Sequence, residues 1–144
     1  MKAPEVDEPF QSLGKHLCRI EGDLVWLRAY GLMDVPDVAV LIEICFGVCK
    51  RYGYALVLID STHLSGITSA ARRLQADRSK ELFAPTHTAT YGAGIVIRTL
   101  LIMIHRAHSL ITGKERLLSF CADEAGAREQ LDLARVRLRA EYRV

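Results

Sequence analysis

Residues 54–71, YALVLIDSTHLSGITSAA, establish the fold class of this chain. Ala55 to Asp60 is an apolar run that ends in an acidic residue and includes the β-branched residues Val57 and Ile59. A run of this length predicts a strand covered on both faces, as in a parallel sheet. The polar residues from Ser61 to Gly66 then predict a loop and the start of a helix. Open α/β sheets bind ligands where strand ends lead into helix N-termini.

The residues before this stretch predict a hairpin and a helix. His16 to Tyr30 alternates around a tight turn at Gly22–Asp23, which is typical of two antiparallel strands. Asp34 suits the N-cap of the helix that follows, and Gly53 suits a left-handed C-cap. This helix has two apolar stripes, which is more than a single sheet can cover. The stripe expected to face the sheet is Leu41, Ile44, Cys45, Val48 and Tyr52, and the second is Val38, Ile42, Phe46 and Cys49.

The residues after this stretch predict alternating helices and strands. A helix is expected from about Ser65 to Leu82, a strand at Thr86–Tyr91, and a very apolar helix at Ile95–Ile111. A last strand at Glu115–Cys121 precedes a helix capped by Asp123. The order ββαβαβαβα predicts an α/β fold, a mixed sheet with parallel central strands flanked by about four helices. The core stripe expected on the last helix is Ala127, Leu131, Ala134 and Leu138.

Composition indicates one globular domain. The chain has 144 residues, of which 50% are hydrophobic and 25% charged. Residues 1–14 are expected to form a flexible N-terminal arm and residues 15–144 the domain. A net charge of +2 does not indicate nucleic-acid binding. Because no apolar run reaches the ~18 residues of a membrane span and no export signal is visible, we expect a cytoplasmic protein with reduced cysteines.

The sequence contains no motif for catalysis, a metal or a cofactor. The patterns GxSxG and HExxH are both absent. His105 and His108 are three residues apart on one expected helix, but nothing on that helix completes a set of metal ligands. Ser61 and Ser65 leave a hydrolase as a minority interpretation, and we expect no catalytic residues.

Three stretches resemble a known family: LVLIDSTHLSGITSAARR, ATYGAGIVIRTLLIMIHRA and LLSFCADEAGAREQL. Together with the element order they resemble the STAS domain, and more closely the small bacterial SpoIIAA-like proteins, a branch of the STAS and lipid-binding CRAL-TRIO type fold. The resemblance covers about residues 16–135. It implies a STAS-like (SpoIIAA-like) fold and a non-catalytic regulatory module that binds a protein partner.

The resemblance also implies a switch at a serine. In anti-sigma-factor antagonists of this fold, a serine at a helix start is phosphorylated, and that modification switches partner binding. The matching position here is Ser65, although the loop after Asp60 is shorter and Leu64 stands where the family has a first serine. From the residues alone, Ser65 also fits a helix N-cap. The candidate phosphorylation or partner-binding residues are Ser65, Asp60, Ser61, Thr62, Gly66, Thr68 and Arg72.

A second candidate site lies at the turn after the strand Thr86–Tyr91. Gly92 and Gly94 would let backbone N–H groups approach an anion beside Tyr91, and Arg98 follows one turn into the helix. The alternative is tight strand–helix packing with Arg98 in a surface ion pair.

The spare apolar surface of the first and third helices has two further interpretations. It indicates either a small apolar or acyl ligand beside the third helix, or a homodimer that covers the surface. A small-molecule or lipid-binding protein is therefore the alternative to a protein-binding module.

Overall fold

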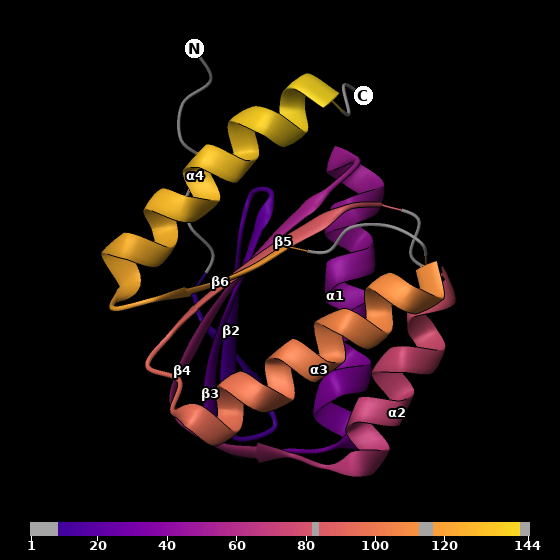
Figure 1. The fold of residues 1–144 in the computed structure, drawn as a ribbon, viewed down its shortest axis with the longest axis vertical. Coiled ribbons are helices and arrows are strands. Elements are labelled where there is room, and N and C mark those ends of the chain that lie inside the picture. The colour runs from indigo at the N-terminus through magenta and orange to yellow at the C-terminus, as the bar shows by residue number, and fades with distance from the viewer. Residues whose placement is uncertain (1–8, 82–83, 113–116, 142–144) are drawn as a thin grey trace.

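The computed structural model describes residues 9–81, 84–112 and 117–141. Strands and helices alternate through most of the chain (Figure 1). In order they are β1 (Gln11–Leu13), β2 (His16–Glu21), β3 (Leu24–Met33), α1 (Val35–Tyr52), β4 (Ala55–Ile67), α2 (Ser69–Arg78), the 3-10 turn η1 (Ser79–Glu81), β5 (Thr86–Tyr91), α3 (Ile95–Thr112), β6 (Leu117–Cys121) and α4 (Glu124–Glu141).

Within the described segments the strands form a six-stranded mixed sheet in the order β1-β2-β3-β4-β5-β6. β2 is antiparallel to both of its neighbours, β1 and β3, and β3 to β6 are parallel. The fold class predicted from the sequence, a mixed sheet with parallel central strands and four helices, is therefore confirmed. The hairpin prediction is confirmed as well, with Gly22 at a positive φ of 61° in its turn.

The helices form two unequal layers. α1, α2 and α3 lie on one side of the sheet and α4 lies on the other (Figure 1). Because each parallel connection is right-handed and the sheet grows in one direction, the three crossover helices must share one face. α4 follows the last strand and is free to cover the opposite face. We call these the three-helix face and the α4 face.

The signals at both ends of α1 were interpreted correctly. Asp34 forms a capping box with Asp37, and Gly53 ends the helix at φ 83°. Both apolar stripes of α1 lie in the core, where the sheet covers one side and α2 packs against the other. The expectation that one stripe would stay uncovered is wrong, because the crossover helices also pack on each other.

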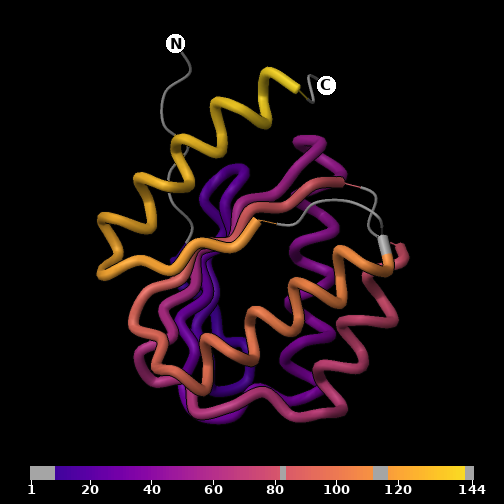
Figure 2. Tube along the Cα trace, viewed as in Figure 1, coloured from indigo at the N-terminus to yellow at the C-terminus, as the bar shows by residue number. Residues whose placement is uncertain are grey.

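The predicted loop and helix start after Asp60 are wrong. β4 continues to Ile67 and pairs with the long strand β3, with Tyr30 opposite His63 and Met33 opposite Ile67. Figure 2 shows the chain then passing along the bottom edge of the molecule into α2. The backbone N–H and C=O groups of β3 give these polar residues a ladder partner, which overrides their preference for a turn.

The N-cap of α2 is consequently Thr68 and not Ser65. Its hydroxyl oxygen accepts from the backbone N–H of Ala71 at 3.1 Å. The same hydroxyl donates to Oδ1 of Asp34 at 3.0 Å. The N-termini of α1 and α2 are thus tied side by side.

Part of the expected N-terminal arm belongs to the sheet. β1 pairs with β2, with Gln11 opposite Cys18, and Leu13 is buried. Residues 1–8 of that arm lie outside the described residues.

Candidate ligand-binding cavity

An apolar cavity of about 130 Å³ lies between the sheet and the three crossover helices. Its walls come from side chains on β3, β4, α1 and α3 that face the interior. Val57 and Ile59 on β4 lie on the sheet side, and Leu101 and Ile104 on α3 lie opposite. The other apolar residues of the wall are Leu27, Met33, Val38, Leu41, Ile42, Cys45, Phe46, Leu64 and Ile67.

The sequence of β5 helps to explain why this space is unfilled. In THTATY, Thr86 and Thr88 face the three-helix side, and both line the cavity. Threonine is short and β-branched, so it supports a strand without reaching across to a helix. The large residues of the neighbouring strand fill only part of the gap. A cavity therefore forms where α3 crosses the sheet.

One end of the cavity is polar. Gln75, Arg78 and Ser79 come from the end of α2 and from η1, and His105 and His108 come from the second half of α3. In a strand–helix–strand unit the end of the helix lies beside the start of the next strand, which brings Thr86 to the same end. The polar wall is thus produced by the topology, although its members are spread over 34 positions of sequence from Gln75 to His108.

Arg78 closes one side of the polar end. Its guanidinium donates to Glu43 on α1 at 2.7 Å and also bonds Glu81. It lies 5.1 Å from the centre of the Phe46 ring. Arg78 thus links α1, α2 and η1 across the edge of the cavity, and two carboxylates balance its charge.

The two histidines predicted to share one side of α3 do so and line the cavity together. His105 donates from Nδ1 to the carbonyl of Leu101 at 2.9 Å, since a carbonyl oxygen can only accept. This bond places Nε2 on the side of the ring away from the helix backbone. Within the described segments no cluster of three or more His, Cys, Asp or Glu residues is arranged to hold a metal ion.

The predicted phosphorylation residues are divided between β4, which contains Asp60, Ser61, Thr62, Ser65 and Gly66, and α2, which has Thr68 as its N-cap and Arg72 in its first half. Ser65 is exposed and lies in the strand, three positions before the N-cap Thr68. Asp60 pairs with Arg28, at 3.6 Å between Nε and Oδ2, and its Oδ1 accepts from the backbone N–H of Thr62 at 3.0 Å. The structure therefore separates these residues, and it leaves Ser65 accessible on a strand that projects beyond β5.

Ser61 is a structural residue. It is 1% exposed, and its hydroxyl lies 2.6 Å from that of Thr90. Because Thr90 donates its own proton to the carbonyl of Ile59 at 2.9 Å, Ser61 must be the donor in the first bond. The hydroxyl is thus committed to joining β4 and β5.

The predicted anion site at the β5–α3 turn is tightly packed. Gly92 has φ 78°, and a Cβ there would lie 2.9 Å from the backbone nitrogen of Thr62. Arg98 donates from Nε to the carbonyl of Ala93 at 3.3 Å and lies 5.1 Å from the Phe120 ring centre. Burial raises the pKa of Tyr91 to about 12, and the negative charges of Asp60 and Glu124 contribute to the same shift. Gly94 is exposed. These contacts agree with tight strand–helix packing, although the contacts of Arg98 are a backbone carbonyl and an aromatic ring and not the expected ion pair.

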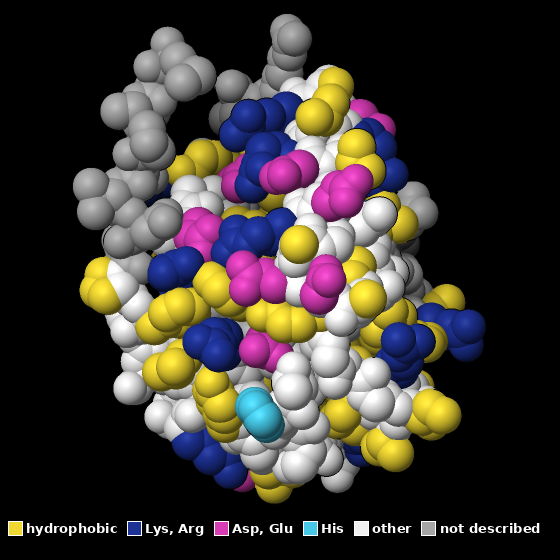
Figure 3. Space-filling model, turned by 90° about the vertical axis from the view of Figure 1, so that its left-hand side faces the viewer, with side chains coloured by type: hydrophobic (Ala, Val, Ile, Leu, Met, Phe, Trp, Pro, Cys, Tyr) yellow, Lys and Arg dark blue, Asp and Glu magenta, His cyan; other side chains and the backbone are white. Residues whose placement is uncertain are grey.

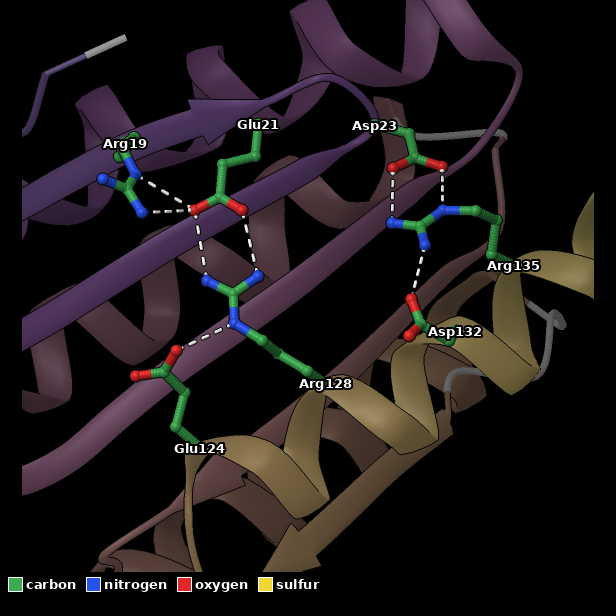
Figure 4. Close-up of polar contacts among 7 residues, drawn as sticks. All are labelled: Arg19, Glu21, Asp23, Glu124, Arg128, Asp132 and Arg135. Atoms are coloured by element: carbon green, nitrogen blue, oxygen red, sulfur yellow. Dashed lines mark hydrogen bonds and ion pairs between the residues drawn. The ribbon is translucent and has the colours of Figure 1, made fainter. Parts of the chain in front are cut away.

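A polar network that was not predicted from the sequence lies beneath α4 (Figure 4). Arg135 donates to both oxygens of Asp23 at 2.8 and 2.9 Å, and Arg128 donates to both oxygens of Glu21 at 3.0 and 3.2 Å. Asp23 is 4% exposed and also accepts from the hydroxyl of Tyr54 at 2.5 Å. The signal for this network was the seven-residue spacing of the two arginines, which places both on one side of α4.

These bonds control the ionisation of the two acids. Burial alone would raise the pKa of Asp23, but hydrogen bonds from Arg135 and Tyr54 outweigh it and lower that pKa. The pKa of Glu21 is also lowered, since bonds from Arg128 and Arg19 outweigh burial.

Figure 3, which looks onto the side where α4 lies, shows Lys and Arg side chains next to Asp and Glu side chains.

No helix in the described part of the chain is both long and apolar enough to span a bilayer. The four cysteines, all in described segments, form no disulfide.

The arrangement is similar to that of two solved structures. One is the anti-sigma factor antagonist SpoIIAA in its unphosphorylated form, with 13% identity and a TM-score of 0.48 over 92% of this chain and 98% of that chain. The other is a protein of the DUF3478 family with a SpoIIAA-like fold from Shewanella loihica PV-4, with 17% identity and a TM-score of 0.48 over 91% of this chain and 99% of that chain. No family model matches the sequence, and no curated protein matches it significantly.

Proposed function

We propose that this protein is a non-catalytic binding protein for a small, mainly apolar molecule, which it holds in the cavity between the sheet and the three crossover helices. The observation that carries the proposal is the cavity itself, about 130 Å³ in volume and lined mostly by aliphatic side chains. Protein interiors are packed nearly as tightly as organic crystals and rarely leave such voids.

The energetics favour an occupant. Side chains that line unfilled volume lack van der Waals partners on one side, and a bound molecule restores those contacts. An apolar cavity of about 150 Å³ stays dry and binds benzene, so this one is matched to an apolar group of about six carbon atoms.

The proposal that the protein is non-catalytic is supported by the environment of Ser61, the serine next to Asp60. The Ser61 hydroxyl is buried and committed to Thr90, so it lacks the general base that a nucleophilic serine requires.

The test is a thermal-shift and calorimetric titration with benzene and toluene, together with native mass spectrometry of the protein from its own cells. We expect both compounds to raise the melting temperature. Val57→Phe, which fills the cavity from β4, is expected to abolish binding, and Val40→Phe is the matched control because Val40 is 50% exposed on α1. Lack of binding by the unaltered protein would refute the proposal.

A second candidate function, a regulatory protein-binding module, is favoured by the projecting part of β4. Thr62, His63 and Ser65 are exposed there, and His63 stacks on Tyr30 with ring centres 5.6 Å apart. A phosphate on Ser65 would be accessible to a partner's basic side chains.

A pull-down from the native cells tests this second function. Ser65→Asp is expected to release the captured partner, whereas Ser69→Asp, at an exposed position on the first turn of α2, is the control. Equal capture by both variants and by the unaltered protein would remove Ser65 as a switch.

A further inference from the structure

We infer that the ligand of this cavity is a small carboxylic acid, whose apolar body lies between β4 and α1 and whose carboxylate meets His105 and His108. This inference rests on the proposed function and specifies its ligand class. It comes from how polar and apolar groups divide along the cavity wall.

The division is nearly complete. The walls contributed by β3, β4 and α1 are entirely apolar, with residues such as Leu27, Val57 and Ile42. The polar members come from α2, η1, β5 and the second half of α3, which meet at one end. A wall of this kind fits a molecule with one polar end, because ligand pockets combine a mainly apolar wall with a few polar groups that fix the orientation of the ligand.

The charges of the polar end favour an anion. Among the described residues that line the cavity there is no aspartate or glutamate, and the basic members are Arg78, His105 and His108. Arg78 is already bonded to Glu43 and Glu81, so it adds little net positive charge. The two imidazoles are therefore the groups that gain most from a negative charge, because each can take a second proton and become a two-sided donor.

The geometry of His105 fits this role. Its Nδ1 proton is held by the carbonyl of Leu101, which fixes the ring and leaves Nε2 on the side away from the helix. His108 follows three residues later, so the two rings lie on the same side of α3 and both reach the cavity. A carboxylate has two oxygens and can accept from both rings at once.

Size limits the acid to a short one. About 130 Å³ accommodates an apolar body close to a benzene ring or a six-carbon chain. A phosphate monoester would bring nearly two negative charges to a site where two imidazoles supply the positive charge. A monocarboxylate is the better match in charge and volume.

The test compares an acid with a neutral molecule of the same shape. Phenylacetate and 2-phenylethanol are titrated calorimetrically into the intact protein. A charge-assisted hydrogen bond contributes about 1.5–3 kcal/mol, so we expect phenylacetate to bind about 10- to 100-fold more tightly. Equal affinities would overturn the inference while leaving the proposed function intact, and binding of neither compound would count against both.

Histidine variants test the residues. His105→Gln combined with His108→Gln is expected to remove the preference for the acid, so that phenylacetate and 2-phenylethanol bind with equal affinity. Arg106→Gln is the matched control, because Arg106 is exposed on the outer side of α3 and does not line the cavity. A preference that survives in the double variant would overturn the assignment. If the double variant has an altered circular dichroism spectrum, His105→Gln alone replaces it and is expected to lower the preference several-fold.

Discussion

The two faces of the sheet are covered by different physical means. On the three-helix face, the helices are connected to strands at both ends and pack through aliphatic side chains around a cavity. On the α4 face, a single helix packs through its apolar stripe and is also held by arginine–carboxylate pairs. Aliphatic packing thus dominates on the three-helix face, whereas α4 combines an apolar stripe with directed polar bonds.

This difference separates the tasks of the two faces. Tight packing and bidentate bonds make the α4 face the rigid support of the sheet. The three-helix face has unfilled volume and few polar bonds across it, which is where a ligand can be accommodated at low cost. The following predictions test this contrast in order of decreasing effect.

The largest effect is expected from Asp23→Asn on the α4 face. The change removes the buried carboxylate that pairs with Arg135, leaves that guanidinium with the exposed Asp132, and weakens the bond from Tyr54. Breaking a buried ion pair by removing one partner costs about 3–5 kcal/mol, and because Arg135 is partly exposed we expect about 3 kcal/mol. Urea denaturation at pH 7 measures the loss.

Asp132→Asn is the matched control for that prediction. Asp132 bonds the same guanidinium at 2.6 Å but its side chain is 69% exposed. Exposed pairs contribute about 0–1 kcal/mol, so we expect a small change. Equal losses in the two variants would show that the α4 face does not depend on the buried carboxylate.

The next effect is a pH dependence from His87, which lies on the α4 side of β5. Burial lowers the pKa of His87 from 6.5 to about 4, and the nearby Arg137 and His105 contribute to the same shift through their charges. Between these two values the unfolded chain binds the proton more readily, so stability falls as the pH falls from 6.5 toward 4. The total loss from this group is at most about 3 kcal/mol.

Urea titrations at half-unit pH steps between 4 and 7 test this dependence. His87→Gln cannot titrate and is expected to show a flatter profile over that window. The carboxylates of Asp23 and Glu21, whose pKa values are lowered, contribute stability that is lost only below their ordinary values of 3.8 and 4.5. Identical slopes in the variant and the unaltered protein would exclude His87 as the source.

A smaller effect should distinguish the packing of the two faces. Val57→Ile adds a methylene group toward the cavity and is expected to change stability by between zero and a gain of about 0.8 kcal/mol. Ala89→Val adds two carbon atoms beneath α4, where Ala89 is fully buried, and is expected to cost about 1–3 kcal/mol. A cost for Val57→Ile as large as that for Ala89→Val would mean that the three-helix face is as tightly packed as the other.

The smallest effect on stability is expected from Met103→Glu on the outer side of α3. Self-association of this chain stays a prediction, and it now depends on α3, because α1 is covered within the domain. The exposed apolar residues of α3 are Ile95, Val96, Ile102, Met103, Leu110 and Ile111.

If a homodimer forms through this surface, Met103→Glu should shift light scattering to the monomer mass and change stability by less than about 0.5 kcal/mol. The control is Leu133→Glu, since Leu133 is 62% exposed on α4. Charges at Phe46 or Leu101 are unsuitable for this test, because Leu101 is buried and Phe46 packs against the core. A monomer already in the unaltered protein would refute the prediction.

The sequence determined most of the secondary structure and the class of the sheet. The apolar run at Val57 and the caps Asp34 and Gly53 are local signals, so they were interpretable without knowledge of their neighbours. The buried stripe of α4 was also predicted residue by residue, because a helix of regular period has only one way to face a sheet.

Only the tertiary structure decided which partners the polar groups bond. Ser61 to Gly66 are typical of a turn, yet β3 offers them a pairing partner and they extend β4. The arginines of α4 could be interpreted as solvated until the hairpin placed Glu21 and Asp23 beside them. The cavity likewise depends on how α3 crosses β5. Each of these outcomes is a contact between residues far apart in the chain, and such contacts leave no periodic pattern in the sequence.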